Sequence, residues 1–124
     1  MNKSIVLGMF DVRDFVETEK KYNASQYPFR NIISYELWYE AVSIIETVSL
    51  ALSRCDKCYF ILTGIEFPLN PEESYTCKEL KFILNHPILL DKVIFVLDGK
   101  ELSEEEALTY LRREDLIQST KRKS

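Results

Sequence analysis

Glycine, proline and histidine are scarce, because the 124 residues include only 3 Gly, 4 Pro and 1 His. Such low glycine and proline contents exclude collagen-like and low-complexity chains. The G-x-G-x-x-G dinucleotide loop and the Walker phosphate loop both need closely spaced glycines. Gly8, Gly64 and Gly99 are too far apart to form either loop. The sequence therefore contains no glycine-rich nucleotide-binding motif.

Long apolar runs are missing too. The N-terminal run covers residues 4–10 and is interrupted by Asp11, whereas a membrane-spanning helix needs about 20 apolar residues. This segment also lacks the longer apolar core and small-residue cleavage site of a signal peptide. The 3 cysteines follow no spacing typical of secreted disulfide frameworks. We therefore expect a cytoplasmic protein with reduced thiols and no membrane contact.

What the sequence does contain is an ordinary globular mixture, with 46% hydrophobic and 29% charged residues. A chain of this length can bury roughly 65% of its unfolded surface, which is enough to fold without a metal or a disulfide. The sequence has neither an internal repeat nor a linker, so we expect one globular α/β domain over residues 1–120. A frayed basic tail should follow at residues 121–124.

The charge balance is acidic, with 16 Lys and Arg against 20 Asp and Glu. Three of the basic residues belong to the tail, so residues 1–120 carry 13 basic and 20 acidic side chains, a net charge of −7. An acidic body repels phosphate backbones, which argues against direct nucleic-acid binding. It favours a basic protein partner, since complementary fields speed encounter. Moderate negative charge also keeps proteins soluble, so charge alone does not decide the function.

Apolar patterning predicts the element order β-α-α-β-α-β-β-α and an α/β fold with a mixed sheet of four to five strands and packed helices. The expected strands cover residues 4–10, 59–63, 93–97 and 100–102, with a short edge strand within 29–33. The expected helices cover residues 12–22, 35–54, 71–85 and 104–115. The signals that bound these elements are N-caps at Asp11, Ser34 and Asn70, a hairpin turn at Asp98 and Gly99, and an S-x-x-E capping box of Ser103 with Glu106.

One candidate site is a thiol cluster. Cys55 and Cys58 form a C-x-x-C, and together with Cys77 and His86 they could bind zinc or support thiol chemistry. The pair is expected where a helix ends and a strand begins, whereas a reactive pair sits at a helix N-terminus. The alternative is that the thiols are small buried hydrophobes and that His86 bonds the last carbonyls of a helix.

A second candidate site is an acidic and aromatic surface for a protein partner. Acidic residues crowd the hairpin and the start of the last helix, and tyrosines crowd the segment after the first helix. The expected contact residues are Glu72, Glu73, Asp98, Glu101, Glu104, Glu105 and Tyr110, with Tyr27 and Tyr39 as a second region. Acids in the first turn of a helix also stabilise the helix, and the tyrosines could pack beneath the loop.

Residues 92–111, KVIFVLDGKELSEEEALTYL, form an apolar strand, a D-G turn and a capped acidic helix. This stretch resembles the ending of small bacterial immunity proteins, the antidotes encoded beside secreted or contact-dependent toxins, many of them nucleases. The resemblance implies a small acidic cytoplasmic protein that is not an enzyme and needs no cofactor. Such a protein would neutralise a cognate toxin by occluding its active or substrate-binding site. The thiol or zinc protein and a regulatory subunit of a cytoplasmic assembly remain alternatives.

Overall fold

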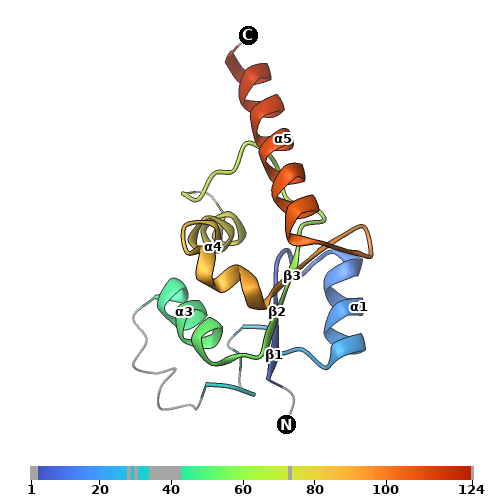
Figure 1. The fold of residues 1–124 in the computed structure, drawn as a ribbon, viewed down its shortest axis with the longest axis vertical. Helices are drawn as coiled ribbons and strands as arrows, with labels where there is room; N and C mark the ends of the chain where they lie inside the picture. The colour runs from blue at the N-terminus through green and yellow to red at the C-terminus, as the bar shows by residue number, and fades with distance from the viewer. Residues whose placement is uncertain (1–2, 28, 30, 34–42, 73, 124) are drawn as a thin grey trace.

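The strands of the chain form one four-stranded mixed sheet among the described residues (Figure 1). The structure is a computed structural model, and it describes residues 3–27, 29, 31–33, 43–72 and 74–123. The strand order is β1-β2-β3-β4, with β1, β2 and β3 parallel and β4 antiparallel to β3. This confirms the expected α/β class and mixed sheet. The elements are β1 (Ser4–Leu7), α1 (Arg13–Tyr22), α3 (Ile44–Arg54), β2 (Lys57–Ile61), α4 (Tyr75–Leu84), the 3-10 helix η1 (Pro87–Lys92), β3 (Val93–Leu97), β4 (Lys100–Leu102) and α5 (Glu104–Lys123).

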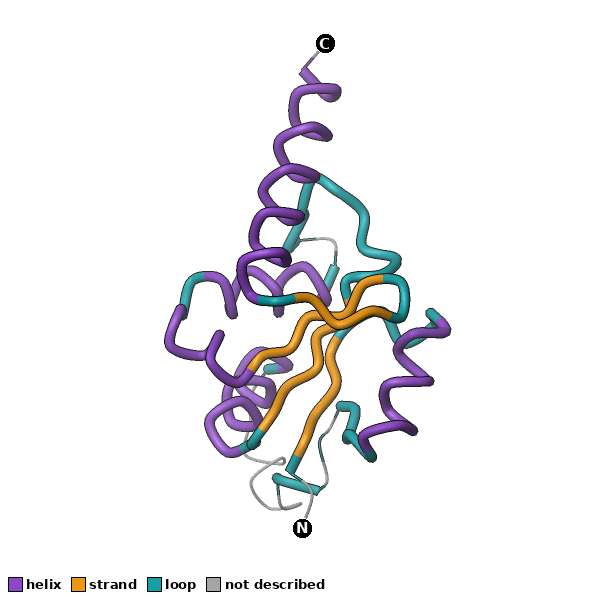
Figure 2. Tube along the Cα trace, turned by 45° about the vertical axis from the view of Figure 1, so that its right-hand side comes forward, coloured by secondary structure: helices purple, strands orange, loops and turns teal. Residues whose placement is uncertain are grey.

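Helices cover both faces of the sheet, with α1 on one side and α3 and α4 on the other (Figures 1 and 2). Strand β2 therefore needs apolar side chains on both faces, and its run is continuously apolar from Cys58 onward. Tyr59 and Ile61 pack towards α1, whereas Cys58 and Phe60 join the larger core beneath α3 and α4. Helix α5 starts after β4 and extends away from the rest of the molecule (Figure 1).

The strand–turn–helix at residues 93–106 is confirmed as expected. The hairpin turn has φ of 51° at Asp98 and 78° at Gly99, the left-handed pair that a two-residue hairpin requires. The Ser103 hydroxyl accepts a hydrogen bond from the Glu106 backbone N–H at 3.1 Å, and the Glu106 carboxylate accepts one from the Ser103 N–H at 3.2 Å. Both halves of the capping box are therefore formed.

Three helices begin later than expected. Helix α1 has Val12 at its N-cap, not Asp11, and Val12 makes no side-chain cap bond. The prediction of one continuous helix over 35–54 is wrong, because the backbone of Ser43 is extended. Ser43 instead caps α3, since its hydroxyl accepts a hydrogen bond from the Glu46 N–H at 3.2 Å. Apolar periodicity alone missed this S-x-x-E box. Ser34, the expected cap, lies outside the described residues.

Helix α4 begins at Tyr75 because Ser74, not Asn70, accepts the cap hydrogen bond, from the Cys77 N–H at 3.3 Å. The Asn70 carboxamide oxygen instead accepts a hydrogen bond from the Glu72 N–H at 3.1 Å within a turn. Asn70 and Ser74 are both good capping residues, and a cap is recognised only by which residue the chain places at the helix start.

The edge strand expected within 29–33 is also wrong. Phe29 has a φ of 62°, and its carbonyl accepts the N–H groups of Ile32 and Ile33, so this segment is a turn. The β1 edge pairs instead with Ser25, through an isolated parallel bridge at Ile5. Ala24, next to Ser25, is buried against the α1 side of the sheet.

Several element ends differ from the expected ones. Strand β1 stops at Leu7 because Gly8 has a φ of 136°, and β2 covers Lys57–Ile61, two residues earlier than expected. Helix α5 continues to Lys123, past the expected end near residue 115, since no Gly or Pro interrupts residues 112–123. In the described part of the chain, no helix has the length and apolar character required to span a membrane.

Candidate functional site

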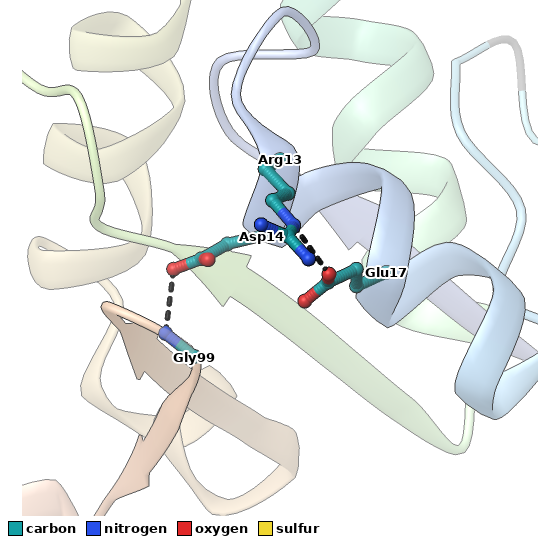
Figure 3. Close-up of polar contacts among 4 residues, drawn as sticks. All are labelled: Arg13, Asp14, Glu17 and Gly99. Carbon is teal, nitrogen blue, oxygen red and sulfur yellow. Dashed lines mark hydrogen bonds and ion pairs between the residues drawn. The ribbon is translucent and has the colours of Figure 1, made fainter.

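The β3–β4 hairpin is fixed to the rest of the fold by one carboxylate. Asp14, in the first turn of α1, accepts a hydrogen bond from the Gly99 N–H at 2.6 Å (Figure 3). It also accepts one from the Thr63 hydroxyl at 2.6 Å. The Thr63 hydroxyl oxygen accepts a third bond from the Asp98 N–H at 2.7 Å. Asp14, Thr63 and the hairpin thus form a network that joins α1, the end of β2 and the turn between β3 and β4. By its position in the sequence, Asp14 would be expected only to favour the start of a helix through the helix dipole.

Five of the expected contact residues, Tyr110 among them, lie on this hairpin and the helix that follows. We call the exposed carboxylates of Asp98, Glu101, Glu104 and Glu105 the acidic corner. Glu101 pairs with Val96 across the ladder, so it projects to the α1 side, where the Tyr22 hydroxyl donates a hydrogen bond to it. Tyr22 in turn stacks on Tyr59 with 4.2 Å between ring centroids. The first-turn position of Glu104 and Glu105 confirms the expected placement of these acids on α5.

Tyr110 lies on the other side of the hairpin. Its half-buried ring packs edge-on against Phe67, with 6.0 Å between centroids. Desolvation raises the pKa of Tyr110, and the negative charges of Glu114 and Asp98 raise it further, which places Asp98 within electrostatic range of this ring. Tyr22 and Tyr110 therefore lie near the acidic corner on opposite faces of the sheet.

The other expected contact residues are not part of this corner. Glu72 is exposed in the turn before α4, and Tyr27 is exposed in the segment that follows α1. Glu73 and Tyr39 lie outside the described residues. The sequence prediction therefore combined residues from different parts of the surface.

The thiols are buried and are not arranged as a metal site. Among the described residues, no group of three or more His, Cys, Asp and Glu side chains is placed to hold a metal ion. Cys55, Cys58 and Cys77 are free and buried. Desolvation raises the pKa of Cys55, and it raises the pKa of Cys58 well above its ordinary value. This is the opposite of the lowered pKa that activates a nucleophilic thiol, and it favours a packing role.

His86 follows the end of α4. Its Nδ1 lies 2.7 Å from the Phe82 carbonyl oxygen, and its ring stacks on the Phe82 ring with 4.3 Å between centroids. A carbonyl can only accept, so this nitrogen carries the proton. The imidazole therefore satisfies one of the last carbonyls of the helix, as its position in the sequence predicted.

Two cavities that sequence reasoning missed lie at the carboxyl ends of the parallel strands, where α/β sheets commonly bind ligands. Each has a volume of about 310 Å³. They meet at Met9 and Ser74, which line both. The first lies beside the β1 end, Phe10, Tyr27 and the first turns of α4, and the second lies beside residues 64–70 and Cys77.

Among the residues that the structure describes, Glu79 is the one carboxylate that lines the first cavity, and it is only 8% exposed. Desolvation raises its pKa to about 7. A signal for this burial was present in the sequence. Thr76, Glu79, Leu80 and Ile83 follow the i, i+3, i+4, i+7 spacing of one helix face, so the pattern places an acid among core positions.

The chain matches no known family model, and neither a curated protein nor a solved structure is detectably similar to it. A functional proposal therefore depends on the geometry and charge of the chain itself.

Proposed function

We propose that this chain is a non-enzymatic binding protein that presents the acidic corner to a basic protein partner and blocks the surface it covers. The observation that carries the proposal is the grouping of exposed carboxylates on a hairpin fixed at three points. Asp14 and Thr63 hold the turn, and the capping box holds the start of α5. A rigid surface loses little conformational entropy on binding, and this favours affinity.

The charge of the whole chain supports the same partner class. The acidic residues outnumber the basic ones by 20 to 16, and 3 of the basic residues are at the C-terminal end of α5. A field of this sign speeds encounter with a basic surface, and the flanking Tyr110 supplies an aromatic group of the kind that dominates binding energy.

The resemblance of residues 92–111 to immunity proteins suggests a specific class of partner. The partner would be a toxin with a basic substrate-binding surface, such as a nuclease, and the acidic corner would occupy the place of the substrate's phosphates. Inhibition would then need no chemistry by this chain, only tight binding that excludes the substrate.

The experiment is capture of partners from the source organism's lysate at low and at high salt, followed by an activity assay of the captured protein. We expect one basic partner that is lost at high salt and whose activity falls to zero at one equivalent of this chain. A partner retained equally at both salt concentrations, or one whose activity this chain leaves unchanged, would contradict the proposal.

A further inference from the structure

The first cavity has an aromatic opening. Five large apolar side chains are exposed among the described residues, and three of them, Phe10, Tyr27 and Tyr75, line this cavity. Phe10 is 74% exposed, Tyr75 62% and Tyr27 43%. Single exposed apolar side chains are ordinary, but a group of them around one cavity is typical of a ligand-binding site, and here they come from three separate segments of the chain.

The cavity wall carries a buried carboxylate, Glu79, that no basic side chain of the described residues neutralises. In the described part of the chain, neither a hydrogen-bond donor nor a basic side chain is paired with Glu79, and burial alone accounts for its shifted pKa. The neighbouring Thr76 hydroxyl is engaged elsewhere, since it donates to the Gly8 carbonyl at 3.3 Å. Burying an unpaired acid costs stability, and such an acid in a cavity is typical of a binding site.

We propose that this cavity binds a small primary amine with an apolar body, whose ammonium group pairs with Glu79 and whose apolar part packs against Phe10, Tyr27 and Tyr75. An ammonium group provides both the donors and the positive charge that the Glu79 carboxylate lacks. The tyrosine and phenylalanine rings also attract a cation through their faces. An anionic ligand would be repelled by the same carboxylate.

The size and rigidity of the cavity fit such a ligand. A volume of about 310 Å³ is at the lower end of small-molecule sites. Gly8, at the end of β1, lies close against β2, because a Cβ at this position would be only 2.8 Å from the Ile61 Cβ. The bond from Thr76 to Gly8 joins α4 to β1 at the same place. A compact aralkylamine such as phenethylamine is therefore a suitable probe.

Binding should depend on pH through Glu79. Among the described residues, the other titratable groups around it are Tyr75 on the same helix, Tyr27 across the cavity, and the Cys58 thiol, which stays protonated because burial raises its pKa. The Lys78 ammonium group lies over the Tyr75 ring, 5.6 Å from the ring centroid. With a pKa of about 7, Glu79 is mostly protonated at pH 6 and mostly ionised at pH 8. Amine affinity should therefore rise about ten-fold between these two pH values.

The test is calorimetric titration of the full chain with phenethylamine and with phenethyl alcohol, its neutral isostere, at pH 6 and pH 8. We expect saturable amine binding at pH 8, at least ten-fold tighter than alcohol binding. Glu79→Gln should lose at least ten-fold in amine affinity and all of its pH dependence. Phe10→Ala should weaken amine binding several-fold. It should leave no cavity in the hydrophobic core, because Phe10 is exposed.

Ile88→Ala is the matched control, since Ile88 is 81% exposed and does not line the cavity. It should bind phenethylamine as the wild type does. No saturable amine binding, equal affinity for the alcohol, or wild-type affinity in Glu79→Gln would each overturn the proposal. None of these results concerns the acidic corner, so the proposed function is tested separately.

Discussion

At the scale of single residues, Asp14 has a greater structural role than its place at a helix start indicates. Its carboxylate accepts hydrogen bonds from two segments that are 49 and 85 residues away in sequence. By contrast, its neighbour Arg13 forms an exposed ion pair with Glu17 within α1, a contact of little energetic value (Figure 3). The position of the hairpin therefore depends on Asp14.

Asp14→Ala should lower the free energy of unfolding by about 2 kcal/mol, because hydrogen bonds to a carboxylate are strong and two donors lose their acceptor. Urea denaturation of the variant measures this loss. Asp11→Ala is the control, since Asp11 is exposed and does not cap α1. A difference between the two variants of less than about 0.5 kcal/mol would show that the network does not stabilise the fold.

Glu79 should make the fold less stable as pH rises. Its pKa is about 7 in the folded chain against an ordinary 4.5, so the unfolded chain releases this proton first. The contribution of Glu79 to the free energy of unfolding is therefore fully present below pH 4.5. It falls by about 3 kcal/mol as pH rises to 7 and beyond.

Comparison with Glu79→Gln isolates this effect, because glutamine has the same shape and does not ionise. The variant should exceed the wild type in unfolding free energy at pH 8 and match it near pH 4.5, as measured by urea denaturation across that range. Glu66→Gln, at an exposed position, should show no pH-dependent difference from the wild type in unfolding free energy. A constant difference between Glu79→Gln and the wild type at all pH values would rule out buried ionisation of Glu79.

At the scale of elements, short polar signals decide where the helices begin. Ser43, Ser74 and Ser103 each accept a hydrogen bond from the backbone N–H three residues later. The far end of α3 is satisfied by another element, because the Lys92 ammonium donates to the Leu52 and Cys55 carbonyls at 2.8 and 3.2 Å. Helix ends in this fold are therefore fixed by specific polar contacts.

Ser43→Ala should cost about 1 kcal/mol in unfolding free energy, since the Glu46 N–H loses its acceptor at the start of α3. Thermal and urea denaturation both report this loss. Ser49→Ala, at an exposed position inside the same helix, should change stability by no more than about 0.5 kcal/mol. Equal effects of the two substitutions would mean that α3 does not start at Ser43.

The sequence predicted elements best where several independent patterns indicated the same structure. At residues 93–106 the apolar run, the D-G turn and the capping box all indicate the same structure, and all are found. Helix starts were harder, because Asn70 and Ser74 are both acceptable caps and periodicity does not distinguish them. The Asp14 network and the Glu79 cavity depend on contacts between distant segments, and no local pattern encodes those contacts.

At the scale of the whole molecule, the negative charge of the acidic corner can be compared with negative charge on other exposed segments. Asp98 follows the carboxyl end of β3, and Glu104 and Glu105 come shortly after it. Asp56 and Asp91 are exposed at the amino ends of β2 and β3. These two groups carry the same kind of charge on different segments of the chain, so one is a matched control for the other.

The decisive measurement is the affinity of the captured basic partner for Glu104→Lys/Glu105→Lys and for Asp56→Lys/Asp91→Lys, at two salt concentrations. Both variants raise the net charge by the same amount. We expect the first to weaken binding at least 100-fold at low salt and to flatten the salt dependence, and the second to weaken it less than five-fold. Equal losses in both variants would show that the partner responds only to total charge and that the acidic corner is not its binding surface.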